Sequence, residues 1–167
     1  MKQRRIIFLA IDGVLNDNTW DEVKDRAWIQ PEFASRLQKI LTTTNAQVVL
    51  ISQRRQPLQA GKINVAGFGL LFRSHGICPN MAGFVPFSVN RCDKTALIKD
   101  WLRNNIWSNY VVLDSGDLKI NNQIITKDGL TDQNVEDTIS ILLGDKEIIV
   151  NKEETLNTDN MVDIGER

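Results

Sequence analysis

Short apolar runs alternate with amphipathic stretches along the 167 residues of the chain. The runs Ile6–Ile11, Ala46–Ile51 and Tyr110–Leu113 are mainly apolar and rich in β-branched residues. Such runs are typical of parallel strands buried on both faces. A last strand of this kind is expected at Glu147–Val150.

The stretches between these runs have helical periodicity. After Pro31, which suits a first helical position, apolar residues recur on one face at Phe33, Leu37, Ile40 and Leu41. Asp93 is an expected N-cap of a helix whose apolar face holds Leu97, Ile98, Trp101 and Leu102. A third helix is expected to begin after Thr131 and to stop at Gly144.

The stretch from Gln56 to Asn90 is rich in glycine and proline, and its pattern is weaker. For it we predict a short helix near Leu58–Val65, a short strand near Leu70–Phe72, and loops elsewhere. Alternation of strands and helices predicts an α/β fold: a three-layer, doubly wound and mainly parallel sheet. The expected domain spans residues 1–151, and residues 152–167 form a polar, acidic tail.

Composition excludes several classes of protein. The formal net charge of −1 argues against a nucleic-acid binder held by broad positive charge, although it allows a local basic site. Cys78 and Cys92 are too few for a disulfide scaffold and match no zinc pattern, so we expect reduced thiols and a cytoplasmic location. The single His75 excludes a multi-histidine metal site, and no apolar run is long enough to cross a membrane.

Polar residues gather where the predicted strands end. Asp12 and Gly13 follow the first strand, and Ser52 follows the second. Asp114 follows the strand at Tyr110–Leu113. Lys94 opens a helix, where a cation is unfavourable unless it has a partner. In a parallel sheet these positions meet at one edge. Two carboxylates, a hydroxyl and an ammonium suit a site for Mg²⁺ and a phosphate group.

These segments resemble the motifs of the haloacid dehalogenase (HAD) superfamily of phosphatases. FLAIDGVLN resembles the first motif, a strand followed by Asp-x-Asp-Gly, and VVLISQRR resembles the second. Lys94 matches the basic residue of the third motif, and YVVLDSGD resembles the fourth. The resemblance covers about residues 5–144. Within the superfamily, this pattern of motifs resembles the branch of HAD domains found in RNA-repair proteins.

The resemblance implies a mechanism and a role for each residue. The first aspartate of the family attacks phosphorus, and the second, here Asp12, protonates the leaving group and then activates water. Mg²⁺ is held by the first aspartate, by the backbone of Asp12 and by Asp114. Ser52 and Lys94 bind the phosphoryl oxygens. Substrate contacts are assigned to Gly13 and to the pair Arg54 and Arg55.

The sequence departs from the family at two positions. Ala10 stands where the family has its nucleophile, so the chain as written is expected to be nearly inactive. The substitution is either an engineered aspartate-to-alanine change in a phosphatase or the mark of a natural pseudoenzyme that binds a phosphorylated ligand or a protein partner. Ser115 stands where the branch often has a second acid, and Asp117 is a candidate to replace it as a metal ligand.

The intervals between the motifs leave room for a minimal cap or none. We expect an open site with a small flap at Asn16–Trp28, in which Trp20 or Trp28 could stack on a base. An open site suits a nucleotide or a nucleic-acid terminal phosphate. The sequence therefore predicts a Mg²⁺-dependent phosphomonoesterase. A phosphotransferase that uses the same aspartate chemistry is an alternative hypothesis. The sequence leaves the oligomeric state open.

Overall fold

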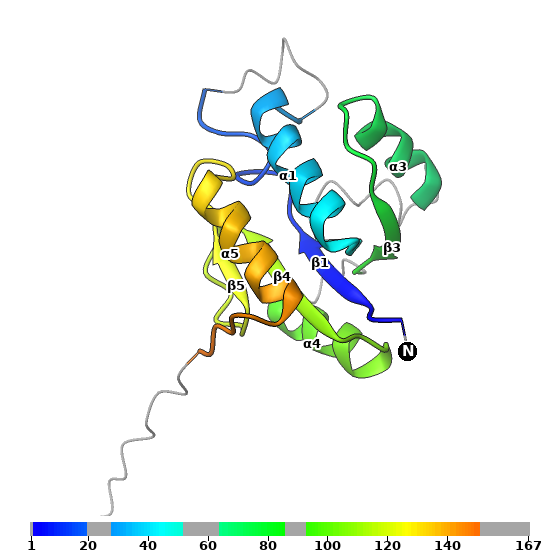
Figure 1. Ribbon diagram of the computed structural model, residues 1–167, viewed down its shortest axis with the longest axis vertical. Helices are drawn as coiled ribbons and strands as arrows, with labels where there is room; N and C mark the ends of the chain where they lie inside the picture. The colour runs from blue at the N-terminus through cyan, green and yellow to red at the C-terminus, as the bar shows by residue number, and fades with distance from the viewer. Residues whose placement is uncertain (1, 20–27, 52–63, 86–92, 151–167) are drawn as a thin grey trace, which may run out of the picture.

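The structure is a computed structural model that describes residues 2–19, 28–51, 64–85 and 93–150. Its five strands form one parallel sheet in the order β3-β2-β1-β4-β5, with helices on both faces (Figure 1). The strands are β1 (Arg5–Leu9), β2 (Gln47–Leu50), β3 (Asn80–Phe84), β4 (Asn109–Asp114) and β5 (Gln123–Ile125). The helices are α1 (Pro31–Thr44), α3 (Val65–Arg73), α4 (Lys94–Asn104) and α5 (Asp132–Leu143). The predicted three-layer α/β fold is confirmed.

The central strand β1 is buried on both faces. Residues 6 to 9 are completely inaccessible to solvent. Phe8 meets the Trp101 ring of α4 edge-on at 5.3 Å between ring centroids. Successive side chains of a strand point to opposite faces, so Ile7 and Leu9 face the layer formed by α1 and α5. Burial on both faces explains why this strand is apolar throughout instead of alternating.

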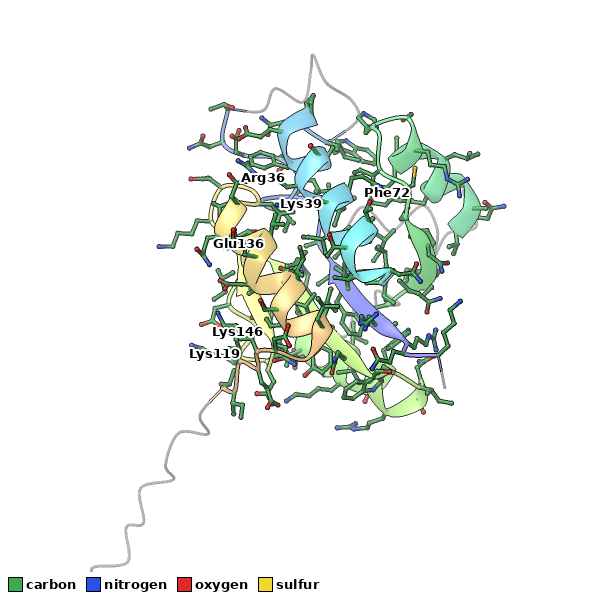
Figure 2. The ribbon with its side chains drawn as sticks, viewed as in Figure 1. Arg36, Lys39, Phe72, Lys119, Glu136 and Lys146 are labelled. Carbon is green, nitrogen blue, oxygen red and sulfur yellow. The ribbon has the colours of Figure 1, made fainter. Side chains whose placement is uncertain are left out.

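Helices α1 and α5 lie side by side on one face of the sheet (Figure 1). Arg36 of α1 joins them at one end, where it is seen beside the start of α5 (Figure 2). Its Nε donates to Asp132 at 2.9 Å, and its Nη1 donates to the carbonyl of Leu130 at 2.9 Å. The hydrogen bond from Arg36 lowers the pKa of the Asp132 carboxyl.

The predicted helix ends are confirmed. Pro31 occupies the first turn of α1. Asp93 caps α4 by accepting from the backbone N–H groups of Thr95 and Ala96. Thr131 forms a capping box with Asn134 at the start of α5, and Gly144 ends that helix in the left-handed conformation.

The prediction for the Gly- and Pro-rich stretch is wrong in two places. Leu70–Phe72 belongs to α3 and not to a strand, because Phe68 and Phe72 pack one helical turn apart in the core, 5.7 Å between ring centroids. Residues 80–84, expected as loop, form the outer strand β3. This strand is only half-buried and its register with β2 shifts between Val48 and Val49, so it lacks the apolar run that marks the inner strands. The helix predicted near Leu58–Val65 lies mostly outside the described residues.

The predicted strand at Glu147–Val150 is also wrong. The last strand of the described residues is β5, and the segment after α5 is held beside it by asparagines. Asn122 Oδ1 accepts from the N–H of Ile148 at 2.9 Å, and Asn121 Oδ1 accepts from the N–H of Val150 at 3.0 Å. The carbonyl of Ile148 also accepts from the backbone N–H of Asn122 at 2.8 Å. The two N–H groups of the segment thus have side-chain amides as partners, whereas a regular ladder would pair them with backbone carbonyls. The predicted tail lies outside the described residues, so its boundary stays a prediction.

The chain order across the sheet changes direction once. From β1 it runs outward through β2 to β3, and it then returns to the other side of β1 with β4 and β5. The crevice beyond the carboxyl ends of β1 and β4 is therefore the topological switch point, where open α/β sheets bind ligands.

No helix among the described residues has the length and hydropathy to cross a bilayer.

We predict that Gly129→Ala destabilises the fold more than Gly76→Ala does. Both glycines have a left-handed φ, of +87° and +76°, so both substitutions carry a conformational cost of about 1–2 kcal/mol. A Cβ at position 129 would also overlap the ring of Phe33, whereas nothing lies within 4 Å of the same atom at position 76. Overpacking adds about 1–3 kcal/mol at Gly129 alone. Urea unfolding of both variants measures the difference, and equal losses would contradict the clash.

Candidate active site

The carboxyl ends of β1 and β4 bring the first and fourth motifs together. The N–H of Ala10 donates to the carbonyl of Leu113 at 3.0 Å, which extends the pairing of these strands past Leu9. Leu9 is paired with Leu113, so this extension sets Ala10 beside Asp114. Ala10, which the resemblance to the superfamily places at the nucleophile position, is 3% exposed and is thus covered by protein.

Asp114 and Lys94 form the central contact of the site. The Lys94 Nζ lies 2.9 Å from one carboxylate oxygen of Asp114, and the other oxygen accepts from the N–H of Gly116 at 2.9 Å. The Asp114 side chain is only 6% exposed. Lys94 is the first residue of α4, where the helix dipole disfavours a cation. Asp114 is therefore the partner that we expected for a cation at this helix end.

Asp12 is exposed, and its carboxylate is positioned by Asn16. The Nδ2 of Asn16 donates to Asp12 at 3.2 Å and to the carbonyl of Trp28 at 3.0 Å. Its Oδ1 accepts from the N–H of Gly13 at 2.9 Å. Asn16 is 5% exposed, so this polar side chain is buried with three partners. Sequence reasoning placed Asn16 inside the first motif but gave it no role.

Gly13 is required where β1 turns into the loop. Its φ is +76°, and a Cβ there would lie 2.6 Å from the Cβ of Ser115. The Ser115 hydroxyl lies 3.4 Å from the carbonyl of Asp12, to which it donates. Glycine at this position therefore lets the loop after β4 approach the backbone of Asp12.

Thr126 is a second residue that sequence reasoning missed. It is 1% exposed, and its hydroxyl donates to the carbonyl of Gly13 at 2.7 Å. The N–H of Gly129 donates to the same carbonyl at 2.9 Å. Both donors belong to the loop after β5, which thereby supports the turn at Asp12 and Gly13. In the sequence, Thr126 is one polar residue among others in this loop, so no pattern marks its role.

Asp117, the candidate replacement acid, pairs with Lys119. The two side chains are 2.6 Å apart, and Asp117 also accepts from the N–H of Lys119 at 3.0 Å. These hydrogen bonds lower the pKa of the Asp117 carboxyl. Metal binding by Asp117 would have to compete with this pair, and it stays a prediction.

Three predicted site residues, Ser52, Arg54 and Arg55, lie outside the described residues, and their roles stay predictions. The N–H of Ile51 donates to the carbonyl of Leu9 at 3.0 Å, so β2 reaches the same edge of the sheet as β1. The predicted flap falls largely on residues 20–27, which are also outside the described residues. The described residues on either side of them are joined by Asn16 and Trp28.

The oxygen ligands at the switch point fit a weakly held Mg²⁺, which would have to compete with Lys94 for the carboxylate of Asp114. They are the carboxylate of Asp114, the carbonyl of Asp12 and the hydroxyl of Ser115, all hard oxygens. Mg²⁺ usually takes one or two carboxylates, with substrate phosphates and water completing its shell. Among the described residues, no group of three or more acidic, histidine or cysteine side chains could hold a metal. The resemblance predicts a further carboxylate ligand at position 10, where this chain has alanine.

Comparison with known proteins identifies the family. Residues 6–135 match the family described as HAD domain in Swiss Army Knife RNA repair proteins. The chain belongs to this HAD family. The match runs from β1 into the first turns of α5, so it contains every described residue of the site. No curated protein and no solved structure matches the chain.

We predict strong coupling between Lys94 and Asp114 in a double-mutant cycle of Lys94→Met and Asp114→Asn. Removing one partner leaves a nearly buried charge uncompensated, whereas removing both does not. The expected coupling in the free energy of unfolding is about 2 kcal/mol. The exposed pair of Asp117 and Lys119 is the control, and the cycle of Asp117→Asn and Lys119→Met is expected to give less than about 1 kcal/mol. Similar coupling in the two cycles would contradict the burial argument.

Proposed function

We propose that this HAD domain is the scaffold of a Mg²⁺-dependent phosphomonoesterase that acts through an aspartyl-phosphate, and that the chain as written lacks the nucleophile. The proposal is carried by one observation. The Asp12 turn and the Asp114–Lys94 pair lie at the carboxyl ends of neighbouring strands, at the switch point, beside Ala10. The family match supports the hydrolase class.

Each residue of the proposed site has a separate role in the reaction. In a chain with aspartate at position 10, that carboxylate attacks phosphorus, and the P–O bond to the leaving group breaks. Asp12 donates a proton to the leaving oxygen, then takes one from the water that hydrolyses the acyl phosphate and releases inorganic phosphate. Asn16 holds the Asp12 carboxylate toward the site. Lys94 supplies a positive charge for the phosphoryl oxygens. Asp114 and the carbonyl of Asp12 would hold Mg²⁺, which when bound neutralises charge on the phosphate.

Two explanations for Ala10 have different support. Asp12, Lys94 and Asp114 are all present, with Asp12 bonded to Asn16 and Lys94 bonded to Asp114, which favours a phosphatase disabled by an engineered change at one position. The pseudoenzyme is favoured by a different feature. Lys94 and Asp114 pair with one another without any acid at position 10, so the missing carboxylate leaves neither of these two charges without a partner. In that case the domain binds a phosphorylated ligand and releases it unchanged.

The proposed substrate is a nucleotide or the terminal phosphate of a nucleic acid. Support comes from the name of the family, whose members are HAD domains of RNA repair proteins. Asp12 is exposed, so the acid/base is accessible to a phosphate on a large molecule. The net charge of −1 limits electrostatic attraction of a polynucleotide to local contacts.

We predict that Ala10→Asp creates Mg²⁺-dependent phosphatase activity. The nucleophile of a concerted site contributes on the order of 10⁴–10⁶ in turnover, so the gain is expected to be of that size. Release of inorganic phosphate is measured from an aryl phosphate, nucleotides, and oligonucleotides phosphorylated at the 3′ or 5′ end. Ala10→Asn, similar in size but unable to attack, is the control. No turnover by Ala10→Asp on any substrate, with ligand binding retained, would favour the pseudoenzyme.

We predict that Asp114→Asn, made in the restored Ala10→Asp protein, raises the Mg²⁺ concentration needed for half-maximal activity by about tenfold or more. An amide replaces the charged oxygen that a hard cation prefers. Asp117→Asn in the same background tests the second candidate ligand. An unchanged Mg²⁺ dependence in Asp114→Asn would contradict the assignment of Asp114, whereas a shift in Asp117→Asn would show that Asp117 leaves Lys119 to bind the metal.

A further inference from the structure

A pocket of about 240 Å³ opens at the amino edge of the sheet, at the ends of the strands opposite to Asp12 and Asp114. Arg5, Gln47 and Asn80, the first residues of the neighbouring strands β1, β2 and β3, contribute to its lining. The two edges are about 17 Å apart along a strand of five residues. The pocket is therefore separate from the proposed phosphatase site.

The lining is rich in hydrogen-bond donors. Lys2, Arg4 and Arg5 supply three cations, and the other lining residues, Gln3, Asn45, Gln47 and Asn80, all carry amides. None of the described residues that line the pocket is acidic. Every lining side chain can thus donate a hydrogen bond, which is the property of a site for an anion.

The arginines orient two of these amides. Arg4 Nε donates to Gln47 Oε1 at 2.7 Å, and an Nη of Arg5 donates to Gln3 Oε1. With their oxygens engaged by guanidinium groups, these two amides keep their NH₂ groups as donors. The arginines therefore remove acceptors from the pocket and leave donors.

The positive charge of the pocket is only partly used by the fold. Arg5 donates to the carbonyls of Leu142 and Thr44, at 2.9 and 3.0 Å, and so satisfies the C-terminal ends of α5 and α1. Arg4 donates to the carbonyl of Ile106 at 3.1 Å and lies 5.7 Å from the centroid of the Trp101 ring. No carboxylate among the described residues forms an ion pair with Lys2, Arg4 or Arg5.

We infer that this amino-edge pocket binds a phosphate group. A tetrahedral oxyanion offers three or four acceptor oxygens, which matches donors that converge from three strands better than the two oxygens of a carboxylate do. Arg and Lys in the absence of a neutralising acid bind such groups by charge-assisted hydrogen bonds. The phosphate belongs either to a free nucleotide or to an internal phosphodiester of a nucleic acid. The site does not depend on catalysis at Asp12.

The test is an NMR titration of the chain as it stands, without Mg²⁺ and at constant ionic strength. The probes are inorganic phosphate, AMP, and an oligonucleotide with hydroxyl groups at both ends. Shifts are expected in the amides of residues 3–5 and in the side-chain amides of Gln47 and Asn80. Lys2→Gln and Arg4→Gln are each expected to weaken binding about tenfold, the loss of one charge-assisted hydrogen bond. Arg103→Gln, an exposed arginine that pairs with Asp100, is the control and is expected to change little.

Each outcome decides the proposal. Tighter binding of AMP supports a free nucleotide, and tighter binding of the oligonucleotide supports an internal phosphodiester. The inference is overturned if shifts are confined to the carboxyl edge, if chloride produces the same shifts, or if malonate binds more tightly than phosphate. It is also overturned if Arg103→Gln weakens binding as much as Arg4→Gln. Because Lys2 is exposed, Lys2→Gln keeps the test valid if Arg4→Gln fails to fold.

Discussion

Burial of β1 between two layers of helices is the constraint on which the rest of this protein depends. A strand covered on both faces has no polar side until it leaves the sheet, so its chemistry is confined to the residues that follow it. β4 pairs with the same strand and ends at the same edge with Asp114. The position of the site therefore follows from the packing of the core.

Electrostatics at this edge is organised by the contact between Lys94 and Asp114. Each residue would be unfavourable alone, Lys94 because it opens a helix and Asp114 because it is nearly buried. Together they form an ion pair that needs no further charge. This balance explains how the domain accommodates alanine at position 10 without an unpaired group, and it is compatible with both explanations for Ala10.

Although the net charge is near zero, the charged residues are distributed unevenly between the two edges of the sheet. Asp12, Asp114 and Asp117 lie in the loops or strand end at the carboxyl edge, and Lys2, Arg4 and Arg5 lie at the amino edge. Asp114 and Asp117 are paired with Lys94 and Lys119, whereas none of the carboxylates in the described part of the chain forms an ion pair with the three cations of the amino edge. Cations without a neutralising acid suit direct contact with an anion.

The sequence alone determined the inner strands, the helix caps at Asp93 and Thr131, and the position of Asp12 and Asp114 at one edge of the sheet, because continuous burial and capping leave local patterns. It did not determine β3 or β5, whose short and partly exposed strands lack such a pattern, and it misplaced the last strand at Glu147–Val150. Tertiary structure alone decided the roles of Asn16 and Thr126, since their partners are distant backbone groups or depend on how a loop folds. It alone also assembled the amino-edge pocket, because Arg5, Gln47 and Asn80 are far apart in the chain and become neighbours only when three parallel strands begin at the same edge.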